Sequence, residues 1–170
     1  MNKTLMTNSS IITLDEKSIQ NNVAFLKKKM GSKVRISAVV KANAYGHGIE
    51  QIIPLFEKYG INHYSVFSYC EAIRVYNSLS EHHPIMIMGW ISDDNLPDVI
   101  KKEIGFFIFN TERLELALEC AKKLNLKANI HLEAETGMNR SGLNNKELLT
   151  AISIIRNNEE FFNVEGFCTH

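Results

Sequence analysis

The residue best suited to chemistry in this 170-residue chain is Lys41, which follows the apolar, β-branched run at 36–40. The run has no helical period and suits a covered parallel strand. Gly46 and Gly48 then turn the chain, and apolar residues recur at helical spacing from Ile49. In α/β folds ligands bind at the carboxyl ends of such strands, so the pattern predicts an amine acting there as nucleophile or base. The alternative is a lysine that reaches solvent from a strand end.

Two later segments carry further candidates. Residues 128–143 begin as an alternating strand, end in a glycine-punctuated turn and contain Glu133 and Arg140. The planar guanidinium of Arg140 suits anionic oxygen acceptors, whereas the alternative is an arginine on a surface loop. The carboxylate of Glu133 could face Arg140, or it could point to another strand neighbour or to solvent. The chain ends with Thr169-His170, and a terminal histidine taken alone would be a frayed end or the remnant of a tag.

These segments together resemble the alanine racemases, a family of barrel-type enzymes that use pyridoxal 5'-phosphate (PLP). Residues 38–48 read Ala-Val-Val-Lys-Ala-Asn-Ala-Tyr-Gly-His-Gly and resemble the family's PLP motif. Residues 135–142 resemble its Asp-Thr-Gly-Met-x-Arg-x-Gly pattern, with Glu135 in the aspartate place. Residues 164–170 resemble the family strand that ends in Thr-His.

The resemblance implies a role for each matching residue. Lys41 would form the Schiff base with PLP and act as one of two catalytic bases, and Tyr45 would hydrogen-bond the cofactor phosphate. Arg140 would contact the phenolic oxygen of the cofactor and the carboxylate of the substrate, and His170 would pack against the face of the pyridoxal ring. Glu133 occupies the place of a lysine that is carbamylated in many members, so it would brace Arg140 with a genetically encoded carboxylate.

The same resemblance implies a PLP-dependent isomerase that interconverts L-alanine and D-alanine and so supplies D-alanine for the peptidoglycan of the cell wall. The full-length enzyme would be a homodimer whose second base is a tyrosine from the carboxyl-terminal β domain of the partner subunit. We expect residues 1–170 to be the amino-terminal portion of such an enzyme, without the β domain and poorly active alone. The alternatives are a small single-barrel PLP-binding protein of cofactor homeostasis, or an inactive partial barrel.

The predicted elements fit the amino-terminal part of a (β/α)₈ barrel of the TIM type, which needs about 250 residues to close. The pattern gives roughly six of the eight strands, alternating with helices in one α/β domain and with no linker. The expected strands are 35–42, 64–68, 84–89, 105–109, 129–133 and 164–169. The expected helices are 15–29, capped by Asp15, then 70–79, 93–102, 111–124, for which Thr111 is the expected cap, and 145–157, with a further helical pattern at 49–56.

Composition indicates a soluble cytoplasmic protein. The formal net charge is zero and 27–29 is the only basic run, which gives no support for nucleic-acid binding. No stretch approaches the ~20 apolar residues of a membrane span, and residues 1–10 lack the apolar core of a signal peptide. Cys70, Cys120 and Cys168 are expected to be reduced and mostly buried. The histidines are expected to be motif, surface or hydrogen-bonded residues, namely His47, His63, His82, His83 and His131. Neither the cysteines nor these histidines show the spacing of metal ligands.

Overall fold

A computed structural model describes residues 10–170. The expectation that residues 1–10 lack a signal peptide falls almost wholly on residues 1–9, which lie outside the described residues. The six strands are all parallel and follow one another in chain order across a single sheet. The strands are β1 (Ala38–Val39), β2 (Tyr64–Val66), β3 (Ile85–Ile87), β4 (Gly105–Ile108), β5 (Ala128–Ala134) and β6 (Phe162–Thr169). This order confirms the prediction of an incomplete (β/α)₈ barrel, because the sheet stays open between β1 and β6.

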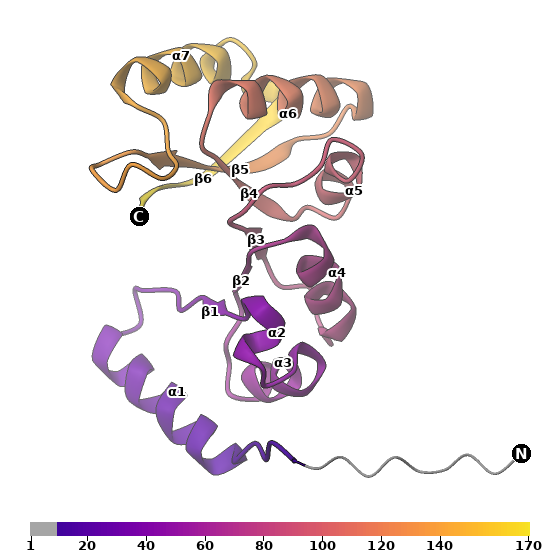
Figure 1. Cartoon of the computed structure of the whole chain (residues 1–170), viewed down its shortest axis with the longest axis vertical. Helices are drawn as coiled ribbons and strands as arrows, with labels where there is room; N and C mark the ends of the chain where they lie inside the picture. Colours follow the sequence, from indigo (N-terminus) through magenta and orange to yellow (C-terminus); the bar gives the residue numbers. More distant parts are fainter. Residues whose placement is uncertain (1–9) are drawn as a thin grey trace, which may run out of the picture.

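Helices join successive strands, as parallel pairing requires. In Figure 1, α4, α5 and α6 lie along one side of the sheet, while α1 stands at the end of the molecule near β1. The helices are α1 (Glu16–Met30), α2 (Lys41–Tyr45), α3 (Ile49–Lys58), α4 (Tyr69–Ser78), α5 (Leu96–Lys101), α6 (Thr111–Leu124) and α7 (Asn145–Arg156), and the short 3₁₀ helix η1 (Glu159–Phe161) precedes β6.

The helix starts follow from side chains that accept the unpaired amide groups of a first turn. Asp15 caps α1 as predicted, with its carboxylate accepting the N–H of Ser18 at 2.9 Å. The predicted cap Thr111 is wrong, because the preceding Asn110 has the extended backbone of a cap and accepts the N–H of Arg113. A polar residue one position earlier thus takes the role, and Thr111 becomes the first helical residue.

The core lies between the sheet and the helices that cover it. Ile53, Val66, Val75, Phe106 and Leu114 are fully buried, and they come from helices and strands in alternation. This is the packing expected when each βα unit buries one apolar helix stripe against the sheet. It fixes the strand ends that carry the candidate residues.

Three local expectations differ from the structure. The strand predicted at 35–42 is paired only over Ala38–Val39, at the edge of the sheet, and Val39 is 42% exposed. The helix predicted at 93–102 is shortened to Leu96–Lys101, since a turn occupies the residues before it. The cysteines are free as expected, but Cys70 is exposed and the other two are only partly buried.

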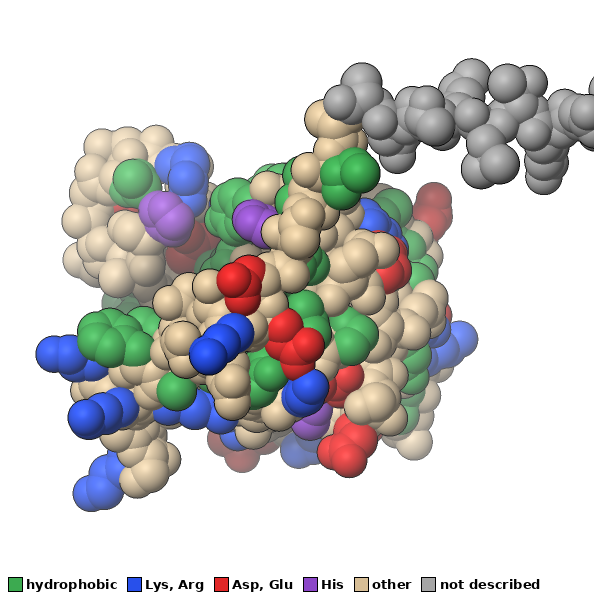
Figure 2. Space-filling view, turned by 90° about the horizontal axis from the view of Figure 1, so that it is seen from below, with side chains coloured by type: hydrophobic (Ala, Val, Ile, Leu, Met, Phe, Trp, Pro, Cys, Tyr) green, Lys and Arg blue, Asp and Glu red, His purple; other side chains and the backbone are tan. Residues whose placement is uncertain are grey.

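Apolar side chains reach the surface where the sheet remains open. In the view from below, they show between lysines and carboxylates (Figure 2). On α1, Phe25 is 59% exposed and Met30 is 46% exposed. On the edge strand β6, Val164 is 46% exposed and Phe167 is 68% exposed. An unpaired edge strand with exposed apolar residues favours pairing with another chain.

We therefore expect the isolated 170-residue chain to associate as its concentration rises. Phe167→Lys should reduce this association, because a charge on an edge strand opposes strand pairing. Leu149→Lys is the matched control, since Leu149 is 70% exposed but lies on α7. Light scattering after size-exclusion chromatography measures the effect. A monodisperse chain at all concentrations, or equal effects of the two variants, would contradict association through β6.

No helix within residues 10–170 has the length and apolar character that crossing a membrane requires.

Candidate functional site

Lys41 opens a left-handed turn that the sequence did not predict. Ala42, Asn43 and Ala44 have φ values of 52°, 56° and 53°, and Tyr45 follows with φ of 53°. Left-handed backbone costs an L-residue roughly 1–2 kcal/mol, so a run of such residues concentrates strain beside Lys41. Strain of this kind persists only where the surroundings hold it, and it is concentrated at functional sites.

The left-handed turn gives a stability prediction with a distinctive sign. Ala42 is exposed and left-handed, so Ala42→Gly should raise the free energy of unfolding by up to about 1 kcal/mol, because glycine removes the steric cost. Ala24 is also exposed but lies inside the right-handed α1, and Ala24→Gly should lower that free energy by about 1 kcal/mol. Denaturant unfolding of both variants tests the difference, and a loss of stability in Ala42→Gly equal to that in Ala24→Gly would refute it.

A cavity of about 390 Å³ lies at the carboxyl ends of the strands and brings together candidates from all three sequence segments. Lys41 lines it from the end of β1, Glu133 from β5, Arg140 from the loop after β5, and His170 from the end of β6. Its remaining walls are largely apolar and aromatic, formed by Phe67, Met88, Gly89, Trp90, Phe107, Phe109 and Ser141. A strand-end cavity with few polar groups in an aromatic lining is the usual form of a ligand site.

The loop that carries Arg140 is organised by Glu135, a residue whose role the sequence did not reveal. Its carboxylate accepts the N–H of Gly137. Hydrogen bonds from backbone N–H groups lower the pKa of Glu135, and the N–H of Asn139 contributes most, followed by that of Gly137. Next to it, the hydroxyl groups of Thr136 and Thr169 are hydrogen-bonded to each other. This contact ties the loop to the end of β6, beside which the chain ends in Figure 1.

Glu133 is buried, with only 3% of its surface exposed. Its side chain accepts a hydrogen bond from the hydroxyl of Ser141 at 3.3 Å. Within residues 10–170 no ion pair joins Glu133 to Arg140, although both line the same cavity. Burial raises the pKa of the Cys168 thiol to about 11, and the nearby Glu133 contributes to this rise. Because Glu133 is buried with a single side-chain hydrogen bond, a cation near its carboxylate would be stabilising.

Tyr45 is the candidate that the structure does not bring to this cavity. Its side chain is 61% exposed and lines a separate apolar groove of about 440 Å³ with residues of α1 and α3, including Ile19, Val23 and Phe56. Tyr45 is the last residue of the left-handed turn, four positions after Lys41. The motif spacing alone could not show its place in the groove.

Two of the histidines are hydrogen-bonded residues, His63 directly before β2 and His131 on β5. His63 Nδ1 lies 2.7 Å from the hydroxyl of Ser37, and burial lowers the pKa of His63 to about 4. His131 Nε2 lies 3.2 Å from a carboxylate oxygen of Glu165, and burial lowers the pKa of His131 although Glu165 opposes the shift. Across the described part of the chain, no group of three or more His, Cys, Asp or Glu residues could hold a metal ion.

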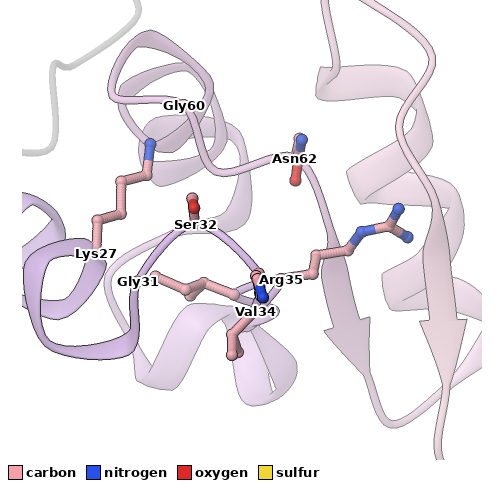
Figure 3. A pocket seen from close by; sticks show the side chains of 9 residues that line it. Lys27, Gly31, Ser32, Val34, Arg35, Gly60 and Asn62 are labelled. Carbon is pink, nitrogen blue, oxygen red and sulfur yellow. The ribbon is translucent and has the colours of Figure 1, made fainter.

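A larger cavity of about 770 Å³ lies at the opposite ends of the strands. Its lining comes from Lys27 of α1 and from residues that precede β1 and β2. Figure 3 shows that Lys27 and Arg35 do not converge, since Lys27 extends toward Gly60 while Arg35 extends toward the strands. Lys27 also donates to the carbonyl of Tyr59 at 2.7 Å. The active sites of (β/α)₈ barrel enzymes lie at the carboxyl ends of the strands, so the smaller cavity is the better candidate site.

The family model described as alanine racemase, N-terminal domain, matches residues 14–170. An alanine racemase of Borreliella burgdorferi is 31% identical over 170 residues, which cover 99% of this chain and 44% of that protein. An alanine racemase of Treponema denticola is 32% identical over 162 residues, covering 95% of this chain and 41% of the relative. The chain thus spans less than half the length of these relatives.

Solved structures show the same arrangement. The alanine racemase of Clostridium difficile 630 matches with a TM-score of 0.80 and 31% identity, over 92% of this chain and 40% of that one. The alanine racemase from E. faecalis matches with a TM-score of 0.81 and 28% identity, over 92% and 42% of the two chains. A histidine racemase of Leuconostoc mesenteroides, 21% identical with a TM-score of 0.80, shares the fold, so the fold does not identify the amino acid.

Proposed function

We propose, because this chain belongs to the alanine racemase N-terminal domain family, that residues 1–170 form the amino-terminal part of the PLP-binding barrel of a longer alanine racemase. That enzyme would interconvert L-alanine and D-alanine, as a cytoplasmic homodimer. The observation that carries the proposal is the meeting of Lys41, Arg140 and His170, from three distant segments, on one cavity at the carboxyl ends of the strands.

The residues present fit PLP by their chemistry. The cavity of about 390 Å³ falls within the roughly 300–1,000 Å³ of small-molecule sites. Lys41 offers an amine for the cofactor carbonyl, and Arg140 offers donors for an anionic oxygen. The aromatic side chains of Phe67, Trp90 and Phe109 supply flat apolar surface for a pyridine ring. The proposed contact of Tyr45 with the cofactor phosphate rests on the motif alone, since its side chain lines the other groove.

PLP, when bound, supplies an electron sink for the negative charge that develops at the α-carbon of the substrate. Lys41 would hold the cofactor covalently until the amino group of the substrate displaces it, and the freed amine would then exchange the α-proton on one face of the substrate. Arg140 would orient the substrate carboxylate with its planar donors. His170, at the end of β6, would lie against the ring and limit its movement. The base for the opposite face would come from the remainder of the racemase.

The test is a racemase assay with PLP on the longest natural protein that contains these residues. Conversion of L-alanine to D-alanine that depends on PLP, and that exceeds conversion of serine and histidine, is the expected result. PLP binding without racemisation of any of the three would contradict the proposal and would instead fit a cofactor-homeostasis protein.

A further inference from the structure

The strained turn after Lys41 is held by a carboxylate from the neighbouring βα unit. Glu71, on α4, accepts the N–H of Ala42 with Oε1 at 2.7 Å. Its other oxygen accepts the N–H groups of Phe67 and Ser68 at 3.0 and 3.1 Å. A capping box requires only the contact with Ser68, so the bond to Ala42 is an additional one that joins two segments far apart in the sequence.

Arg74, one helical turn further along α4, holds the next residue of the turn. Its Nη2 donates to Oδ1 of Asn43 at 2.6 Å, and the same Oδ1 accepts the N–H of Ile49 at 3.3 Å. The guanidinium is itself fixed by Glu50, whose two oxygens accept from Nε and Nη2 at 2.7 and 2.6 Å. Hydrogen bonding to Arg74 lowers the pKa of Glu50 to about 2, so this pair is charged at neutral pH.

These contacts account for a backbone that is unfavourable by itself. Left-handed alanines persist only where their surroundings over-determine them. Bonds from backbone N–H groups to a carboxylate are roughly twice as strong as bonds between neutral groups. Glu71 also fixes the end of β2, because it binds the N–H of Phe67, whose side chain lines the Lys41 cavity. It therefore links two walls of that cavity.

We infer that Glu71 and Arg74 are positioning residues that hold the left-handed turn and so direct the amine of Lys41 into the cavity. The inference rests on the proposed function of Lys41 as the PLP-binding residue. Neither side chain lines the cavity itself. Their effect is exerted through the backbone of Ala42 and the side chain of Asn43.

The test compares Glu71→Gln with Glu57→Gln in the PLP-binding protein. Glu57 is a matched control, because its carboxylate also accepts backbone N–H groups, from Ser80 at 3.1 Å and Glu81 at 3.4 Å, but on α3 and away from the cavity. Two properties are measured at a temperature where both variants are folded. One is hydrogen exchange at the Ala42 amide without PLP, and the other is the rate at which PLP and borohydride modify Lys41, followed by mass spectrometry.

In Glu71→Gln the Ala42 amide should lose its protection from hydrogen exchange, since a charged acceptor is lost. The rate at which PLP and borohydride modify Lys41 should fall about tenfold or more. Glu57→Gln should change both by less than about twofold. Should Glu71→Gln fail to fold, Arg74→Lys replaces it, with a slower modification of Lys41 as the expected result. Unchanged Ala42 protection, an unchanged rate, or equal effects in Glu57→Gln would overturn the inference.

The unsubstituted protein separates this inference from the proposed function. If PLP modifies no Lys41 there, the proposed function fails, and the exchange measurement decides the inference about the turn: loss of Ala42 protection in Glu71→Gln supports it, and retained protection overturns it.

Discussion

Borohydride treatment of the protein with PLP is expected to fix a pyridoxyl group on Lys41, and Lys41→Ala should abolish both this labelling and racemisation. The substitution removes the covalent anchor together with one base, and loss of general acid–base catalysis alone costs roughly 10²–10⁴-fold. The rate of D-alanine formation and mass spectrometry of the Lys41 peptide measure the two effects. We expect the racemase rate to fall at least as far as that range.

Lys27→Ala is the control for the position of the site. Lys27 lines the larger cavity at the opposite ends of the strands, so its loss should leave the labelling of Lys41 within about twofold of the unsubstituted rate. Labelling that moves to another lysine, or that persists at full extent in Lys41→Ala, would exclude Lys41 as the anchor. Loss of labelling in Lys27→Ala would instead place the cofactor in the larger cavity.

The local pattern of the chain predicted the βα order because that order depends on short-range signals. Helix α6 begins and ends where its 3.6-residue period predicts, and all six strands occur in the expected order. The extent of β1 was overestimated, because β-branched residues favour a strand whether or not a partner lies on both sides. Pairing partners are a property of the whole sheet.

The candidate site was predicted in part, because some of its residues stand in short sequence motifs. The position of Lys41 after a strand predicted a site at the carboxyl ends of the sheet, and the resemblance to the alanine racemase motifs added Arg140 and His170, which line the same cavity. The left-handed turn could not be foreseen, since alanine has no intrinsic preference for positive φ and the stabilising groups lie on α4. The place of Tyr45 in the groove with residues of α1 and α3 was not foreseen either, because it depends on how those helices pack.

Glu133 is the second residue whose substitution should have a large effect. A carboxylate with 3% exposure and one long hydrogen bond from Ser141 is stabilised poorly by its immediate contacts. Arg140 lines the same cavity and is the cation that could compensate it, so we predict that the two groups approach each other when substrate and cofactor are bound. Glu133→Gln should then lower racemase activity about 10- to 100-fold, since it deletes a charge-assisted partner at nearly constant volume.

Glu133→Lys provides the sharper experiment, because it reverses the charge beside Arg140. An unpaired cation in this buried place should repel the guanidinium and reduce activity below that of Glu133→Gln. Bicarbonate should restore part of the activity of Glu133→Lys, since a carbamate on the new lysine would again present a negative group to Arg140. The unsubstituted protein should keep its activity when bicarbonate and carbon dioxide are removed, because its carboxylate is encoded. Kinetics with and without bicarbonate measure all three proteins, and activity of Glu133→Gln equal to the unsubstituted rate would mean that Glu133 does not brace Arg140.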